Sequence, residues 1–208
     1  MSDKRLVLTI ARGYGSGGRT MARRLGEQLG IPVYDKEILR MASDESGINE
    51  ELFGRVDEKV KKIFLATSGK YKGKPLSPSH SGFTSDDNLF ELQAEVIRRI
   101  AETEDCIFVG RCADYILKDK DYVTRVYMYA SEEDCLHRLR QTMSDPDDVL
   151  IERMRDIDRQ RAEYYKYYTG HEWDDSKNYD LCLNTGKMSY SHLVNVVRAY
   201  LDNKTAVL

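Results

Sequence analysis

Short apolar runs alternate with helical patterns along this chain. The runs at 5–11, 106–109 and 125–130 are apolar at most positions, as strands buried on both faces are, and shorter runs follow at 31–35 and 179–184. Between the runs, apolar residues recur three or four positions apart, which is the spacing of one helix face. Strands separated by helices predict an α/β fold, in which a mostly parallel sheet lies between two layers of helices.

Glycines and capping residues predict where helices begin and end. Gly30 ends the first helical pattern, and residues 36–62 are expected to form two helices that are interrupted near Ser46 and Gly47. Ser131, which three acidic residues follow, is expected to cap a later helix.

The segment from Ser68 to Asn88 is crowded with serine, glycine and proline. This is the composition of a loop or a mobile flap, and it cannot supply a core of its own. An apolar stripe at helical spacing begins again at Leu89 and reaches Ile100. We expect this stripe to pack in the core rather than to form a ligand site.

Composition narrows the class of protein. At 208 residues, the chain is expected to form a single domain, 1–208. Apolar residues make up 41% and charged residues 32%, which excludes a disordered or fibrous chain, and the net charge of −3 offers no general attraction for nucleic acid. No apolar run reaches membrane length and no secretory signal pattern is present, so we expect a cytoplasmic protein that binds neither membrane nor nucleic acid.

Cysteine and histidine give no indication of a metal centre. The four cysteines lack C-x-x-C spacing and are expected to be reduced and mostly buried, and the four histidines are scattered. A structural metal is therefore not expected. The cysteines are Cys106, Cys112, Cys135 and Cys182.

The first apolar run leads directly into Gly13-Tyr14-Gly15-Ser16-Gly17-Gly18-Arg19-Thr20 and then into a helical pattern. This order predicts a phosphate site, because glycines let the backbone wrap an anion and the start of the helix directs N–H groups at it. In the pattern G-x-x-x-x-G-K-[ST], Gly13 and Gly18 take the glycine positions, and Thr20 takes the place of the hydroxyl that binds Mg²⁺.

Arg19 stands where this pattern has lysine. A guanidinium binds phosphate through a planar fork and an ammonium is a compact point charge, so the reach and angle of the two differ. The alternative is a glycine-rich turn that only packs tightly. The cation and the hydroxyl that follow the glycines favour the phosphate site.

Two further polar residues follow other strands of the expected sheet. Asp35 ends the second apolar run, and Arg111 follows Gly110 after the third. Ligands of open α/β sheets bind beyond the carboxyl ends of the strands, where the glycine loop also lies. An arginine at this edge is expected to bind a ligand rather than to serve packing.

Several strings together resemble the cytidylate kinase-like family, a branch of the nucleoside-monophosphate kinases. In chain order they are ARGYGSGGRT, LGIPVYDKEIL, FELQAEVIRRIA, VGRCADYIL, DIDRQRAEYYKYYTG and NYDLCLNT. The resemblance covers nearly the whole chain and is weakest from Phe53 to Asn88. It implies a three-layer P-loop kinase fold with a parallel sheet of five strands, a helical acceptor-binding insertion at about 36–90 and a lid at about 143–162.

The resemblance also implies an activity. Members transfer the γ-phosphoryl group of ATP, with Mg²⁺, to a nucleoside monophosphate, which here points to CMP or dCMP. Residues Gly13 to Thr20 match the loop that binds the phosphates of ATP, with Thr20 at the metal. Arg111 matches an arginine that binds the acceptor phosphate, and Asp35 is expected to orient the acceptor or the metal.

The charged stretch of the lid is matched by the run from Asp158 to Arg161. A metaphosphate-like transition state needs cations around the γ-phosphoryl oxygens. The catalytic candidates are therefore the arginines Arg19, Arg155, Arg159 and Arg161, together with Asp158, which matches the aspartate of the lid. On most helices, charges at this spacing form only a solvated ion-pair face, which remains the alternative for the helical members of the set.

Two departures from the family pattern concern the acceptor. Met154 stands where these kinases have an arginine four residues before the lid aspartate, and residues 36–40 lack the small side chains expected around cytidylate. A kinase for another phosphorylated or hydroxylated metabolite, and a nucleotide-binding regulatory protein without turnover, are the alternatives. The tyrosines at 164–168 and Trp173 are expected to pack the lid helix rather than to stack on a base.

Overall fold

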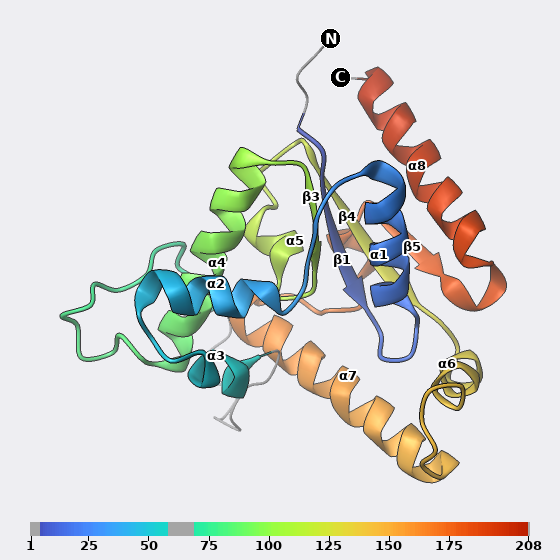
Figure 1. Ribbon diagram of the computed structural model, residues 1–208, viewed down its shortest axis with the longest axis horizontal. Helices are drawn as coiled ribbons and strands as arrows, with labels where there is room; N and C mark the ends of the chain where they lie inside the picture. Colours follow the sequence, from blue (N-terminus) through green and yellow to red (C-terminus); the bar gives the residue numbers. More distant parts are fainter. Residues whose placement is uncertain (1–4, 58–68, 208) are drawn as a thin grey trace.

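A parallel sheet of five strands forms the centre of the computed structural model, which describes residues 5–57 and 69–207 (Figure 1). The strands are β1 (Val7–Arg12), β2 (Val33–Tyr34), β3 (Cys106–Val109), β4 (Val123–Tyr129) and β5 (Leu181–Asn184). They lie in the order β2-β3-β1-β4-β5, and every neighbouring pair is parallel. All residues of β1 and β3 are buried, as their continuous apolar runs predicted. The predicted α/β fold is confirmed.

Helices cover both faces of the sheet. On one face, α1 (Gly18–Leu29) and α8 (Tyr190–Val207) pack against β1, β3, β4 and β5, and Met21 and Val197 are fully buried there. On the other face, α4 (Asp86–Thr103) and α5 (Ala113–Ile116) enclose a larger core with Phe90 and Phe108. Figure 1 shows these two layers on opposite sides of the strands.

The predicted break near Ser46 and Gly47 is confirmed. Helix α2 (Glu37–Ser46) ends at Gly47, whose φ of 71° is left-handed and suits glycine, and α3 (Glu50–Val56) follows. Residues 58–68, which include part of the predicted insertion at 36–90, lie outside the described residues.

Residues 69–85 contain no helix or strand, as their composition predicted. Helix α4 begins at Asp86, a little before the apolar stripe, because the Ser85 side chain caps it by accepting a hydrogen bond from the Asn88 N–H. The loop is tied to α4 by two buried side chains. Asn88 accepts a hydrogen bond from the Leu76 N–H at 2.6 Å, and Glu91 accepts one from the Lys72 N–H.

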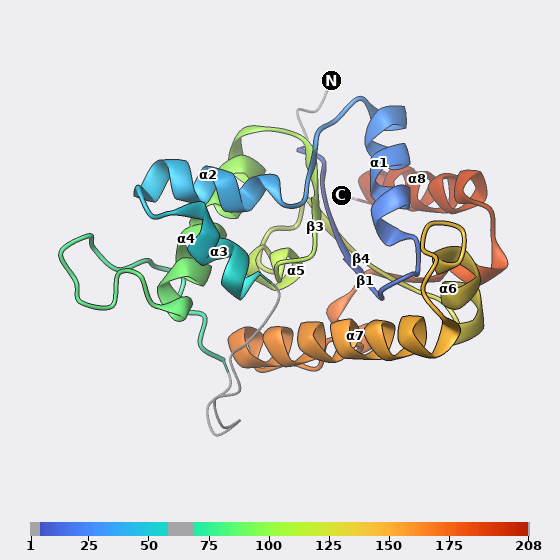
Figure 2. The ribbon, with the colours of Figure 1, turned by 60° about the horizontal axis from the view of Figure 1, so that its bottom comes forward.

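Two helices lie beyond the carboxyl ends of the strands. Helix α6 (Glu132–Leu139) is capped by Ser131, as predicted, and α7 (Asp147–Thr169) crosses this edge of the sheet (Figure 2). The predicted lid at 143–162 falls largely on the first half of α7. The second half is buried in the larger core through tyrosines, and Trp173 joins them, which confirms that this cluster serves packing. These tyrosines are Tyr164, Tyr165 and Tyr168.

All four cysteines are free thiols, and Cys106, Cys112 and Cys135 are buried whereas Cys182 is exposed. Burial raises the pKa of Cys106 to about 12 and that of Cys135 to about 11, so both are protonated, unreactive thiols. Within the described part of the chain, no helix combines the length and apolar character needed to span a membrane.

Candidate active site

The glycine loop joins β1 to α1 at the carboxyl edge of the sheet. The Gly13 N–H donates to the Met128 carbonyl at 3.0 Å, which ties the start of the loop to β4. Gly15 and Gly17 have φ of 75° and 79°, values that favour glycine. At Gly17 a Cβ would also collide with the hydroxyl of Tyr190. The sequence motif thus forms the compact loop that a phosphate site requires.

A cavity of about 450 Å³ opens on this loop, and we call it the loop cavity. Its lining combines the glycines, Arg19 and Thr20 with side chains from α6 and from the segment that follows it, among them Arg138 and Gln141. Tyr190, at the start of α8, closes another side. Backbone N–H groups at a helix start and nearby arginines give this cavity the chemistry that an anion-binding site needs.

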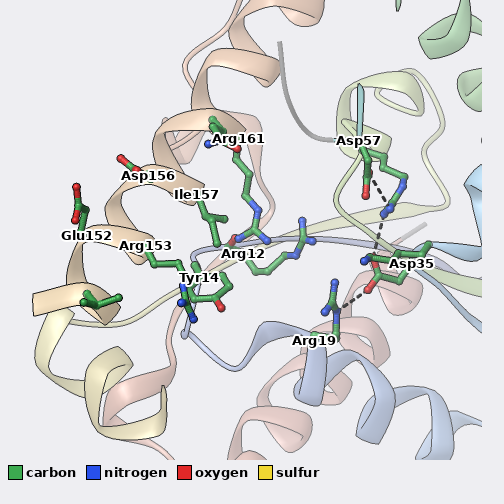
Figure 3. Close-up of a pocket in the computed structure, with 14 residues that line it drawn as sticks. Arg12, Tyr14, Arg19, Asp35, Asp57, Glu152, Arg153, Asp156, Ile157 and Arg161 are labelled. Atoms are coloured by element: carbon green, nitrogen blue, oxygen red, sulfur yellow. Dashed lines mark hydrogen bonds and ion pairs between the residues drawn. The ribbon is translucent and has the colours of Figure 1, made fainter. Parts of the chain in front are cut away.

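A second cavity of about 560 Å³, the strand-end cavity, lies beside it (Figure 3). The strand ends and α3 contribute Asp35, Arg111 and Asp57, and α7 contributes Arg153 and other side chains. The same four residues line both cavities. They are Arg12, Tyr14, Arg19 and Arg161. The two cavities therefore meet at a junction that carries three arginines.

Arg111 has a strained backbone, and two carboxylates hold its side chain in place. Gly110, Arg111 and Cys112 have φ of 75°, 56° and 54°, and a left-handed residue other than glycine costs about 1–3 kcal/mol, which persists mostly at functional sites. The Arg111 side chain is 3% exposed, with Nη1 3.0 Å from Asp35 Oδ1 and Nη2 2.9 Å from Asp57 Oδ1. Its guanidinium is therefore fixed at the wall of the strand-end cavity.

Arg19 reaches the same carboxylate from the other side. Its Nε lies 2.5 Å from Asp35 Oδ2, and its side chain is 47% exposed (Figure 3). Asp35 therefore connects the arginine of the glycine loop with the arginine at the end of β3. This arrangement brings together three of the residues that the sequence predicted for the site.

Two residues of α7 contact the glycine loop or the residue directly before it. Asp158 Oδ1 accepts a hydrogen bond from the Tyr14 N–H at 2.7 Å, and burial raises the pKa of this carboxyl. Arg161 Nη1 donates to the Arg12 carbonyl at 3.1 Å and lies 3.4 Å from Asp158 Oδ1. The structure thus places Arg161 at the junction of the cavities and Asp158 beside it, in contact with Arg161 and Tyr14.

Arg155 and Arg159 lie elsewhere on the same helix. Arg155 pairs with Glu132 at 2.9 Å and Arg159 with Asp156 at 2.6 Å, and their side chains are 67% and 63% exposed. Neither lines the two cavities. They form here the solvated pairs that their spacing also allowed, and a catalytic role for them stays a prediction.

Sequence reasoning missed Arg12 and Asp57. Arg12 is the last residue of β1, is 5% exposed and lines both cavities. A charged residue that ends an otherwise apolar strand directly before the glycines was the available signal. Asp57 follows α3 in the region where the resemblance is weakest, and no pattern marks it.

The donor set fits a Mg²⁺ ion that enters with a nucleotide. Thr20 lies exposed in the first turn of α1 and lines the loop cavity. Among the residues that the structure describes, no group of three or more histidine, cysteine, aspartate or glutamate side chains could hold a metal ion. Mg²⁺ in nucleotide sites keeps several waters and takes few protein ligands beside the phosphate oxygens.

Comparisons with known proteins identify the family of this chain. A family model described as the cytidylate kinase-like family matches residues 7–187. A protein named cytidylate kinase from Methanopyrus kandleri is 26% identical over 206 residues, which cover 95% of this chain and 93% of that protein.

Two solved structures show the same fold. An uncharacterised protein from Eubacterium ventriosum has a TM-score of 0.71 at 23% identity and covers 95% of this chain and 99% of its own. A shikimate kinase from Bacteroides thetaiotaomicron has a TM-score of 0.56 at 14% identity, with 95% and 98% covered. With a P-loop kinase fold, a glycine loop at its expected edge and a family match along most of its length, this chain belongs to the cytidylate kinase-like family.

Proposed function

We propose that this protein transfers the γ-phosphoryl group of ATP to a nucleoside monophosphate, with CMP or dCMP as the acceptor. The observation that carries the proposal is the junction of the two cavities at Arg12, Arg19 and Arg161. Phosphoryl transfer needs two binding sites that meet at a cluster of cations, because its transition state is stabilised mainly by charge and in-line positioning.

In this proposal, ATP occupies the loop cavity. The glycine loop and the start of α1 direct N–H groups at its phosphates, and Thr20 binds the accompanying Mg²⁺, whose charge would further neutralise the phosphates. Arg161 comes from α7 and Arg12 from β1, so the γ-phosphoryl group would pass between two elements. Asp158, which now accepts from the Tyr14 N–H, would hold α7 against the loop.

The acceptor occupies the strand-end cavity, with its phosphate on Arg111. The two carboxylates beside Arg111 fix the direction of its guanidinium fork, and a bidentate contact with phosphate needs this fixed direction. The choice of CMP or dCMP is supported by the family match and by the name of the relative from Methanopyrus kandleri.

An acceptor panel with ADP release as readout tests the proposal. The panel contains CMP, dCMP, UMP, AMP and GMP, together with shikimate, which the similar fold of a shikimate kinase brings in. We expect release to be fastest with CMP or dCMP. ADP release only with a compound that is not a nucleotide would mean that the acceptor is not a nucleoside monophosphate. Tight ATP binding without release for any compound would indicate a regulatory protein.

A further inference from the structure

The back of the glycine loop rests on two segments that are remote from it in the sequence. Arg138 of α6 directs Nη1 at the Ser16 carbonyl, at 3.2 Å, and at the Gly15 carbonyl, at 3.4 Å. The hydroxyl of Thr185, the first residue of the short helix η2 (Thr185–Lys187), lies 2.6 Å from the same Ser16 carbonyl. Two side chains thus donate to one carbonyl of the loop.

Arg138 and Thr185 also bind each other. Arg138 Nη2 donates to the Thr185 carbonyl at 2.6 Å, and Arg138 Nη1 lies 3.3 Å from Thr185 Oγ1. Thr185 is 1% exposed and does not line either cavity, whereas Arg138 lines the loop cavity. A ligand in the loop cavity therefore does not contact Thr185 directly, and Thr185 can affect it only through the loop or through Arg138.

These contacts set the direction of the loop's peptide groups. In a planar trans peptide, the C=O and the following N–H point in opposite directions. Holding the Ser16 carbonyl against Thr185 and Arg138 therefore turns the Gly17 N–H to the opposite side of the loop. Consecutive N–H groups that face one side form an anion-binding concavity.

Packing supports the same conformation. A Cβ on Gly15 would come within 3.0 Å of the Cys135 Cβ, so α6 lies directly against the loop. Gly15 and Gly17 reach their left-handed values without strain, but glycine is equally free to leave them, so external contacts are needed to hold the loop in one conformation.

We propose that Thr185 and Arg138 are positioning residues that hold the glycine loop in its anion-binding conformation. The identification of the anion as a nucleotide phosphate rests on the proposed function. The bracing itself is a property of the unliganded loop and can be measured without any ligand.

The test compares Thr185→Val, which keeps the shape and removes the O–H, with Thr185→Ser, which keeps the O–H. The probe is Mg·ADP, measured by titration calorimetry. We expect Thr185→Val to weaken ADP binding about tenfold, the usual effect of one lost buried hydrogen bond, and Thr185→Ser to bind within about twofold of wild type. The KM for ATP should rise with the same factor, and the KM for the acceptor should not change.

Arg138 supplies the second arm and Arg140 its matched control. Arg138→Gln should weaken ADP binding at least as much, and the double variant with Thr185→Val should add little, because the two side chains share the Ser16 carbonyl and bind each other. Arg140, which directly follows α6, is exposed and bound to Asp147, so Arg140→Gln should bind ADP as wild type does.

Hydrogen exchange of the amides at 13–20, measured without ligand, separates a local effect on the loop from a general loss of stability. Exchange there should accelerate several-fold in Thr185→Val and in Arg138→Gln, while exchange in β1 and α4 stays the same. Loop exchange and ADP affinity within twofold of wild type in both variants would overturn the proposal. If wild type binds no nucleotide, the proposed function fails and exchange alone decides the bracing. If Thr185→Val does not fold, Arg138→Gln and Arg138→Lys decide it.

Discussion

Asp114 is a buried carboxyl whose removal should change how stability depends on pH. It lies at the start of α5, is 4% exposed and accepts a hydrogen bond from the Tyr165 hydroxyl at 2.6 Å. Burial raises the pKa of this carboxyl, whereas the Tyr165 hydrogen bond and the nearby Arg125 lower it. Burial is the larger effect, so the pKa rises from 3.8 to about 6. The substitution Asp114→Asn keeps an oxygen that can accept from Tyr165 and removes the titration.

The size of the effect follows from this pKa. A shift from 3.8 to about 6, at about 1.4 kcal/mol per unit, corresponds to about 3 kcal/mol. Because the folded state binds the proton more tightly than the unfolded state, the contribution is full below about pH 4 and is lost as the pH rises through about 6. Between about pH 4.5 and pH 7.5, wild type should lose about 2 kcal/mol of unfolding free energy relative to Asp114→Asn.

Urea unfolding at a series of pH values measures this difference. From pH 4.5 to pH 7.5, the urea midpoint of wild type should fall relative to the midpoint of Asp114→Asn. This relative change should be complete by about pH 7. Asp121→Asn, which removes a carboxylate from an exposed position, is the matched control. A difference between wild type and Asp114→Asn that stays constant across this range would refute the reasoning.

Three further predictions concern the active site. Arg111→Ala should lower kcat/KM for the acceptor at least about 100-fold and leave ATP affinity within twofold of wild type. Arg111→Lys should restore little of this activity, because an ammonium cannot form the bidentate contact of a guanidinium. A loss of ATP affinity with an unchanged acceptor KM would mean that the assignment of the two sites is reversed. Arg19→Ala should lower turnover by orders of magnitude with an unchanged melting curve, and Arg19→Lys should retain part of it; wild-type turnover in Arg19→Ala would mean that another residue supplies the cation. A ligand that binds only the folded protein stabilises it by about 2.7 kcal/mol at 100 times its dissociation constant, and we expect this stabilisation with Mg·ATP. Gly18→Val should abolish it, because a Cβ at Gly18 would collide with the Arg12 side chain. A melting shift that is retained in the variant would contradict this prediction.

The sheet and the glycine loop could be predicted from the sequence because their signals are local. An apolar run such as 106–109 needs burial on both faces, and only a parallel sheet between helices provides it for several strands. The order strand, glycines, helix likewise fixes the loop at the carboxyl edge, which the structure confirms. Asp35 and Arg111 could be placed together at this edge because each follows a strand of the same parallel sheet.

Other contacts depend on the way distant segments pack, and no local pattern encodes them. Arg155 and Arg161 lie on one helix with the same kind of charged neighbours, yet only Arg161 faces the glycine loop. Which face of α7 turns inward is decided by its buried tyrosines and by the core they join. The Ser16 carbonyl meets Thr185 across 169 positions of the chain, a separation that sequence periodicity does not describe.

Met154 shows that a departure from the family pattern changes packing as well as charge. Its side chain is 5% exposed and belongs to a small apolar cluster between α6 and α7, with Tyr14 of the glycine loop packed against it. An arginine buried in this cluster would need a partner for its charge, which apolar neighbours do not supply. At this position the methionine therefore gives an apolar contact between α7 and the loop in place of a positive charge. Among the arginines described in α7, Arg161 is then the one at the junction of both cavities. In the proposed function, the charge that the transition state needs would come from Arg161 together with Arg12 and Arg19.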